Sequence, residues 1–141
     1  MRLWHKDLIP LLPQNQLVGQ WRECCALAKG IAETGKTNHI LIDLIMEYPL
    51  SHFYNYTKLV ILELERRGYA LRHEAFWKWA RQWPERIGVH SGVPDDEIFK
   101  GWHNDRYLRQ CYYNLEEKYD CGGISVDEFS RIAKLMTERD G

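Results

Sequence analysis

Residues 51–67, SHFYNYTKLVILELERR, carry the clearest structural pattern in the chain and decide its fold class. Large side chains recur there at spacings of three and four, which is the period of an α-helix with one buried face. These positions are Phe53, Tyr56, Leu59, Val60, Leu64 and Arg67. Gly68 follows directly, and glycine is the usual residue just beyond a helix C-terminus. The pattern therefore predicts a long amphipathic helix that stops at Gly68.

A second helix is expected before this one. Pro13 suits the first turn of a helix, and apolar residues follow it at helical spacing until the pattern fades near Gly30 or Gly35. Between the two helices lies the apolar stretch 40–46, which ends at Pro49. We expect this stretch to be short and buried, and its periodicity does not decide between helix and strand.

The second half of the chain continues the helical pattern. A helix with three tryptophans nearby is expected over residues 73–83, and core packing is the expected role of these rings. Residues 84–103, with two prolines and three glycines, predict an irregular connection. A helix from Asn104 or Asp105 to about Tyr119 follows, and the last one starts at Ser125 with a capping box. No segment alternates with the period of a strand, so the sequence predicts an all-α fold of about five helices.

Length and composition bound the class of protein. The 141 residues are 45% hydrophobic and 28% charged, an ordinary globular mixture, and we expect residues 1–141 to form a single compact domain. The formal net charge of −1 gives no global basic field, although a local basic face is enough to bind nucleic acid. We expect a monomer.

No apolar run approaches the roughly 18 residues of a membrane span, and Asp7 with two prolines interrupts any signal-peptide pattern. The cysteines are Cys24, Cys25, Cys111 and Cys121. They have no paired spacing, so we interpret them as reduced thiols of a cytoplasmic protein, with no metal site and no cofactor.

The block Leu12–Glu23, LPQNQLVGQWRE, carries the functional signal. A short lead-in precedes a helix with Gln16-Leu17 and then an aromatic-Arg-Glu triplet, at a fixed distance from residue 1. The block resembles the pyrimidine-dimer DNA glycosylase family, the phage-type endonuclease V-like enzymes that combine glycosylase and abasic-site lyase activities. Residues 53–69 and 103–118 resemble the family's second and third helices more weakly, so that about half of the chain is covered.

The resemblance implies a DNA repair enzyme that acts on damaged double-stranded DNA through a Schiff base with its own N-terminal α-amine. An amine must be neutral to attack the sugar C1′, and an α-amine with a pKa near 7.7–8.0 is partly neutral already, unlike a lysine near 10.4. The resemblance implies that Glu23 is the catalytic carboxylate. Because Arg2 is large, the initiator methionine is expected to stay, which makes Met1 the nucleophile; processing would transfer this role to Arg2.

Further residues are expected to hold the DNA. The guanidinium of Arg22 suits a phosphate, and an ion pair with a nearby acid is its alternative role. Lys118 retains a lysine of the family's third helix, and His5 lies close enough to the terminus to contact substrate. Ala26 and Asn114 stand where the family carries arginines, which predicts weaker, salt-dependent binding.

The C-terminal sequence TERDG lacks the family's aromatic, basic tail, so the sequence leaves the excised lesion open. A different class of function also stays open, namely a non-catalytic helical module that binds nucleic acid or protein and keeps the family fold. A metal-dependent nuclease is a third reading, and it would lose activity in EDTA.

Overall fold

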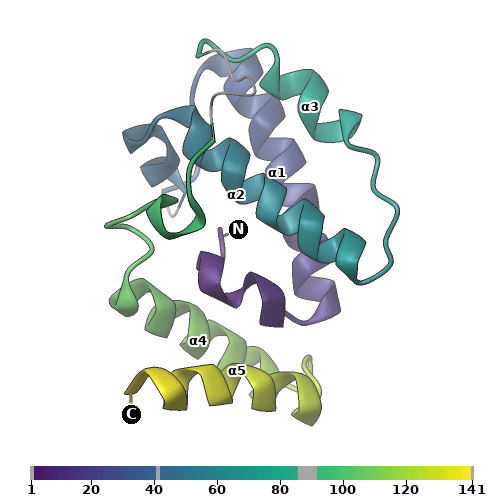
Figure 1. The fold of residues 1–141 in the computed structure, drawn as a ribbon, viewed down its shortest axis with the longest axis vertical. Coiled ribbons are helices and arrows are strands. Elements are labelled where there is room, and N and C mark those ends of the chain that lie inside the picture. Colours follow the sequence, from purple (N-terminus) through teal and green to yellow (C-terminus); the bar gives the residue numbers. More distant parts are fainter. Residues whose placement is uncertain (1, 41, 86–91, 141) are drawn as a thin grey trace.

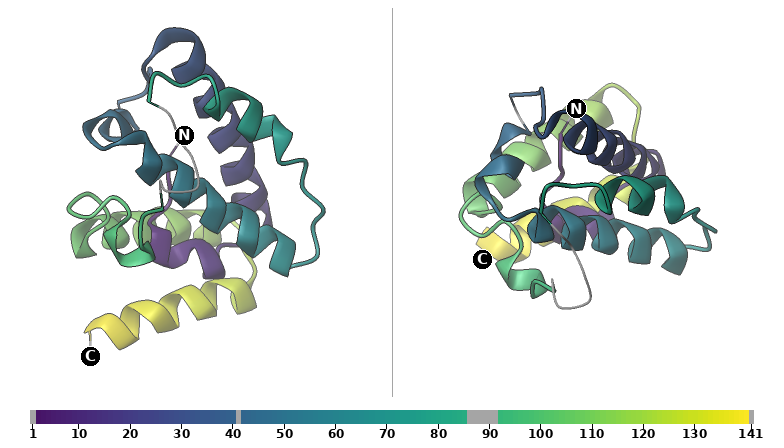
Figure 2. Two further views of the ribbon diagram at one scale, coloured as in Figure 1. Left: turned by 45° about the horizontal axis from the view of Figure 1, so that its top comes forward. Right: turned by 90° about the horizontal axis from the view of Figure 1, so that it is seen from above.

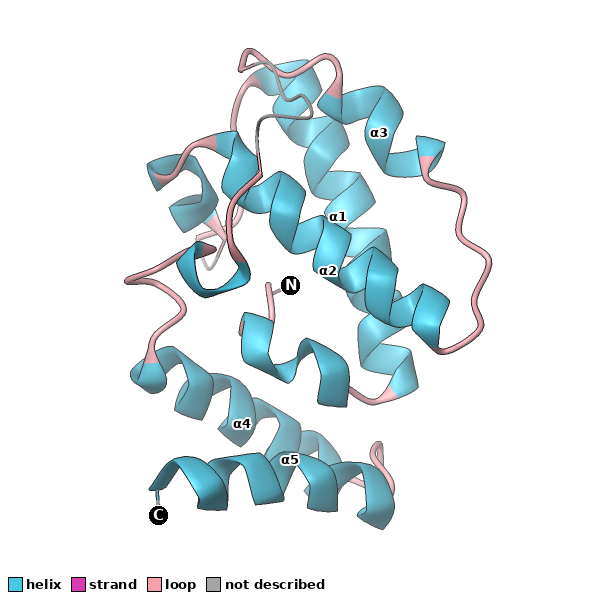
Figure 3. Cartoon of the chain, in the orientation of Figure 1, coloured by secondary structure: helices cyan, strands magenta, loops and turns pink. Residues whose placement is uncertain are grey.

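The computed structural model describes residues 2–40, 42–85 and 92–140 (Figure 1). Over these residues the chain forms only helices and loops, with no strand (Figure 3), which confirms the all-α prediction. The α-helices are α1 (Gln14–Thr34), α2 (Leu50–Arg66), α3 (Glu74–Ala80), α4 (Asp105–Asp120) and α5 (Val126–Asp140). The 3-10 helices are η1 (Lys6–Leu11), η2 (Asp43–Glu47) and η3 (Asp95–Glu97). No helix in these three ranges is both long and apolar enough to cross a membrane.

The ends of α1 and α2 and the starts of α4 and α5 lie where the sequence predicts them, whereas α3 ends at Ala80, before the predicted end at residue 83. Gly35 and Gly68 follow α1 and α2 with φ of 74° and 99°, a backbone conformation that favours glycine. The side chain of Asn104 accepts a hydrogen bond from the Tyr107 N–H at 2.9 Å and caps α4. At α5 the backbone N–H of Ser125 donates to the Glu128 carboxylate, and the Glu128 N–H donates back to the Ser125 hydroxyl, both at 3.2 Å. This reciprocal pair is the predicted capping box.

Two groups of helices enclose the start of the chain. α1 packs against α2 and α3, while α4 and α5 form an antiparallel pair at the bottom of Figure 1. The short helix η1 contacts both α2 and α5, and Figure 2 shows from two further sides that it lies between them. The residues that begin the chain are therefore part of the core.

The tryptophans of the 73–83 segment pack as predicted. Trp83 is buried, stacks on Phe53 with ring centroids 5.7 Å apart, and donates a hydrogen bond to the Ala28 carbonyl at 3.0 Å. Trp77 and Trp79 are half-buried against the same core. These rings join α1, α2 and α3 into one layer.

The apolar stretch 40–46 differs from its prediction. Of its described residues, 40 and 42–46, only Ile42 and Ile45 are buried, whereas Ile40, Leu44 and Met46 are 85%, 43% and 39% exposed. The backbone turns here with a period of three, so side chains three residues apart share a face and those between them point outward. The expectation of a fully buried segment was wrong, because a single 3-10 turn has room for only one buried row.

Candidate active site

The N-terminal segment, residues 2–5, runs through the interior. Leu3, Trp4 and His5 are 0%, 7% and 2% exposed. A buried peptide needs partners for its backbone N–H and C=O groups, and helices α1, α2 and α4 supply them as side chains.

Gln20 of α1 is the central partner of this segment. Its side chain is buried, accepts a hydrogen bond from the Trp4 N–H at 2.7 Å, and donates one to the Arg2 carbonyl at 3.1 Å. The same amide nitrogen lies 3.2 Å from a carboxylate oxygen of Glu23, one turn further along α1. Gln20 therefore fixes the start of the chain beside the Glu23 carboxylate.

Two tyrosines complete the anchoring. The Tyr56 hydroxyl of α2 lies 2.5 Å from the Trp4 carbonyl oxygen and 3.0 Å from the Gln20 amide oxygen. The Tyr107 hydroxyl of α4 donates to the Leu3 carbonyl. Because three helices each contribute a side chain, the position of residue 2 is determined by the folded protein as a whole.

Glu23 has an environment that suits a reactive carboxylate. Its side chain is half-buried, and burial raises the pKa of the carboxyl above its ordinary value. Hydrogen bonds from the backbone N–H of Arg2 and from the Gln20 amide act on the pKa in the opposite direction. A half-buried carboxylate that accepts an N–H donor but forms no ion pair within the described residues is a typical candidate for catalysis.

An open cavity of about 290 Å³ adjoins this carboxylate, and we refer to it as the Glu23 cavity. Its lining comprises Arg2, Trp4, Gln16, Gly19, Glu23, Asn114 and Lys118. The structure thus brings together three residues that the sequence nominates, namely Arg2, Glu23 and Lys118. The Arg2 guanidinium lies over the Trp4 ring, 5.9 Å from its centroid.

Arg22 and Lys118 are exposed, and neither forms an ion pair with any residue in the described ranges. The alternative expected for Arg22, an ion pair with a nearby acid, is therefore absent from this part of the chain. Within the same ranges no group of three or more histidine, cysteine or acidic side chains is arranged to hold a metal ion.

His5 requires a correction. Its ring accepts a hydrogen bond from the Asp7 N–H at 3.1 Å, caps η1 and stacks on His103 with centroids 5.1 Å apart. With only 2% of its surface exposed, the side chain offers nothing to a phosphate or a base. The expectation that His5 contacts DNA is wrong, because its ring is needed inside the protein to hold the turn after residue 5.

Met1, the predicted nucleophile, lies outside the described residues. Sequence reasoning missed Gln20, Tyr56 and Tyr107, which position the chain start. A signal for Gln20 exists in the sequence, since it precedes Glu23 by three positions and so shares its side of the helix. No comparable signal exists for the tyrosines.

The fold and this site together define a class of protein, namely helical proteins in which the first residues of the chain are buried beside a carboxylate that lines a cavity. The family model described as pyrimidine dimer DNA glycosylase matches residues 1–76, which include α1, α2 and Glu23. The chain belongs to the pyrimidine dimer DNA glycosylase family. No curated protein and no solved structure matches it.

Proposed function

We propose that the protein is a DNA glycosylase and abasic-site lyase that acts on damaged duplex DNA, with its N-terminal α-amine as nucleophile and Glu23 as catalytic carboxylate. One observation supports the proposal above the others: Gln20 donates both to the Arg2 carbonyl and to the Glu23 carboxylate, so that Arg2 is held beside Glu23 at an open cavity. Holding a carboxylate beside the second residue of the chain does little for the stability of the fold, because partial burial of the charged group costs free energy.

Covalent geometry limits how far the α-amine can lie from the Glu23 carboxylate. Successive backbone nitrogens, joined through Cα and the carbonyl carbon, are about 3–4 Å apart in any conformation. Because Gln20 holds the Arg2 carbonyl beside the Glu23 carboxylate, the α-amine is at most one residue away from this peptide along the chain. Removal of Met1 would make the Arg2 nitrogen the amine itself. Both forms of the chain start are compatible with the mechanism.

In the proposed reaction the neutral amine attacks the sugar C1′, and the bond from C1′ to the damaged base breaks as the base leaves with a proton. The sugar ring opens to give a protonated Schiff base. Loss of a C2′ proton then breaks the 3′ C–O bond, and the 3′ phosphate leaves. Water finally hydrolyses the Schiff base and frees the amine. The ionised Glu23 would stabilise the positive charge on the sugar and help to move these protons.

Cations at the edge of the site would hold the phosphates. Arg22 and Lys118 lie on α1 and α4, which flank the Glu23 cavity, and both are exposed without an ion-pair partner in the described chain. A DNA phosphate would supply the missing negative charge.

Borohydride trapping on a duplex with one abasic site tests the mechanism. Protein with a native N-terminus is mixed with the duplex in EDTA and reduced, and the adduct peptide is identified by mass spectrometry. We expect an adduct on the α-amine that an N-terminal extension abolishes. Absence of an adduct, with a free N-terminus and an intact fold, would refute the lyase mechanism and favour a helical binding module; activity that disappears only in EDTA would favour a metal-dependent nuclease.

A further inference from the structure

The described residues of the segment between α1 and α2, namely 39–40 and 42–47, present apolar side chains to solvent. Ile40 is 85% exposed, the largest exposed fraction among the large apolar residues of the described chain, and Leu44 in the same segment is 43% exposed. Single exposed apolar residues are common on protein surfaces, so exposure alone carries no function. Two further features distinguish this segment: its hydrogen bonds and its position next to α4.

The backbone under Ile40 is held firmly. The Asp43 carboxylate accepts hydrogen bonds from the Thr37 hydroxyl at 2.6 Å and from the His39 N–H at 3.2 Å. The N–H groups of Ile42 and Asp43 donate to the His39 carbonyl at 2.8 and 2.9 Å. Ile42 is fully buried. The residues on both sides of Ile40 are therefore fixed by hydrogen bonds and by the burial of Ile42.

The segment adjoins the Glu23 cavity along one face of α4. Ile40 and Leu44 border a second cavity of about 610 Å³, which Arg106 and Gln110 of α4 also line. Asn114 and Lys118, the next residues at four-residue spacing on α4, line the Glu23 cavity. The four residue steps from Gln110 to Asn114 advance about 6 Å along the helix axis. This length is close to that of two base-pair steps of about 3.4 Å each.

The chemistry of the proposed reaction requires a distorted duplex. A nucleophile in the Glu23 cavity reaches C1′ only when the nucleotide is unstacked, and unstacking costs a few kcal/mol per step in ordinary duplexes. Proteins commonly meet this requirement by inserting an apolar side chain between base pairs. Arg106, exposed and without an ion-pair partner among the described residues, can hold a phosphate on the far side of the insertion.

We infer that Ile40 is the wedge that enters the base stack and kinks the DNA, with Leu44 widening the apolar contact. The inference rests on the proposed function, since it assigns the residue that opens the duplex for the Glu23 site. Ile40 is a positioning residue and takes no part in bond making. Its occupant is duplex DNA, because a row of polar and basic side chains on α4, from Arg106 to Lys118, connects the cavity at Ile40 with the proposed catalytic cavity and suits a phosphate backbone.

The test compares Ile40→Ala with a control, Leu62→Ala, which removes an apolar side chain that is 59% exposed on α2 and lines the Lys6 side of the molecule. Abasic-site cleavage is measured on duplex and on single-stranded DNA, and the conservative Ile40→Met variant is included. We expect Ile40→Ala to lose about tenfold on the duplex, or about 1.4 kcal/mol, with the single-strand rate within about twofold of wild type. Ile40→Met should restore the duplex rate, and Leu62→Ala should resemble wild type.

A second readout detects the insertion itself. A duplex with 2-aminopurine next to an uncleavable tetrahydrofuran abasic analogue should brighten when wild-type protein binds, because the base unstacks, and should brighten less with Ile40→Ala. Equal fluorescence and an equal duplex-to-single-strand ratio for both proteins would overturn the wedge. Failure of the wild-type protein to form a borohydride adduct on single-stranded abasic DNA, where no stack has to be opened, would instead overturn the proposed function.

Discussion

Two carboxylates, one on each side of the molecule, have opposite environments. Glu23 faces its cavity with no arginine or lysine paired to it in the described chain, and burial raises the pKa of its carboxyl. Glu63 of α2 is also buried, and burial alone would raise its pKa as well. Hydrogen bonds from Arg66 at 3.1 Å and Arg67 at 2.8 Å outweigh burial and lower the pKa of Glu63.

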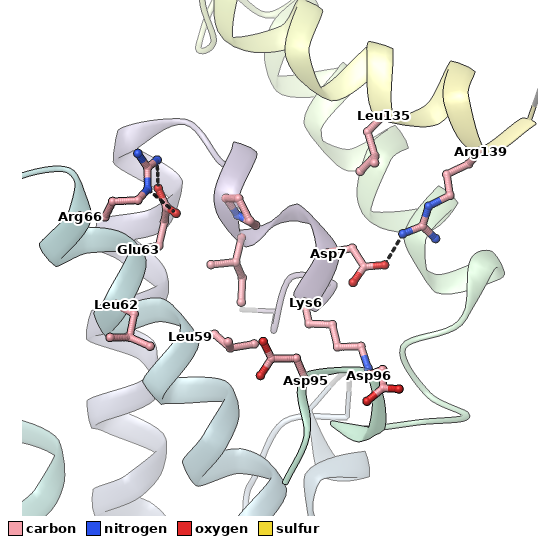
Figure 4. Close-up of a pocket in the computed structure, with 12 residues that line it drawn as sticks. Lys6, Asp7, Leu59, Leu62, Glu63, Arg66, Asp95, Asp96, Leu135 and Arg139 are labelled. Carbon is pink, nitrogen blue, oxygen red and sulfur yellow. Dashed lines mark hydrogen bonds and ion pairs between the residues drawn. The ribbon is translucent and has the colours of Figure 1, made fainter. Parts of the chain in front are cut away.

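The other basic groups near Glu63 also have partners within the protein. It lines a larger cavity, about 570 Å³, which we refer to as the Lys6 cavity (Figure 4). Arg139 pairs there with Asp7, and the Lys6 ammonium donates to the Ile98 carbonyl at 2.8 Å. Each of these cations already has an internal partner, so the larger cavity has little free positive charge to offer a ligand. Free positive charge, more than volume, distinguishes the side on which we propose the active site.

The largest expected effect separates the two carboxylates by activity. Glu23→Gln should lower abasic-site cleavage by at least about 100-fold, because an amide cannot stabilise the cationic sugar. Glu63→Gln is the matched control and should stay within about twofold of wild type, since it touches no part of the proposed site. Single-turnover cleavage of an abasic duplex measures both. Similar losses in the two variants would remove the distinction between the cavities.

The anchor of the chain start is expected to matter next. Gln20→Ala leaves the Trp4 N–H and the Arg2 carbonyl without a partner and should cost about 1–3 kcal/mol of stability. Because the amine then loses its fixed position, cleavage should fall about 10- to 100-fold at a temperature where the variant is folded. Adduct yield with borohydride reports the same loss. A destabilised variant with wild-type cleavage would show that anchoring serves the fold alone.

Salt dependence should distinguish the cations of the two sides. Arg22→Ala and Lys118→Ala should each reduce the slope of log K against log salt by about one, because one phosphate contact is lost. Arg66→Ala, whose arginine is paired with Glu63, should leave the slope unchanged. Fluorescence anisotropy with a labelled abasic-analogue duplex gives these slopes. An equal reduction by Arg66→Ala would place DNA on the Lys6 side as well.

The smallest effect concerns stability, and its sign differs between the carboxylates. Glu63, with a lowered folded pKa, stabilises the protein above its unfolded pKa and loses this contribution as the pH falls through the folded value. Glu23, with a raised folded pKa, contributes most below its unfolded pKa and loses this contribution as the pH rises through the folded value. At pH 7, therefore, Glu63→Gln should lower the free energy of unfolding by about 1–3 kcal/mol, whereas Glu23→Gln should leave it equal or higher. Urea unfolding at pH 7 measures both.

The sequence predicts the helices well, because each is set by local periodicity and local caps. Gly35, Gly68, Asn104 and Ser125 act within one turn of the helix that they end or begin. The 40–46 stretch was misjudged, since composition indicates burial while the outcome depends on which side of a single turn meets the core.

The candidate site was predictable only in part. Glu23, Arg22 and Lys118 came from the family resemblance, which preserves residue types at fixed spacing. The anchoring of the chain start could not be predicted, because its partners are remote: Tyr56 lies 52 positions from Trp4, and Tyr107 lies 104 positions from Leu3. The burial of His5 escaped prediction for the same reason, since its stacking partner is His103.

The anchored chain start has a consequence for biosynthesis. The ribosome makes residues 2–5 first, yet one of their anchors, Tyr107, is added more than a hundred residues later. The beginning of the chain therefore lacks one of its hydrogen-bond partners while α1 and α2 are synthesised. It takes its final position only when α4 is available. A nascent or truncated polypeptide that ends before α4 would carry the amine without a fixed position. Under the proposed mechanism, the site at the start of the chain is therefore complete only after α4 has been synthesised.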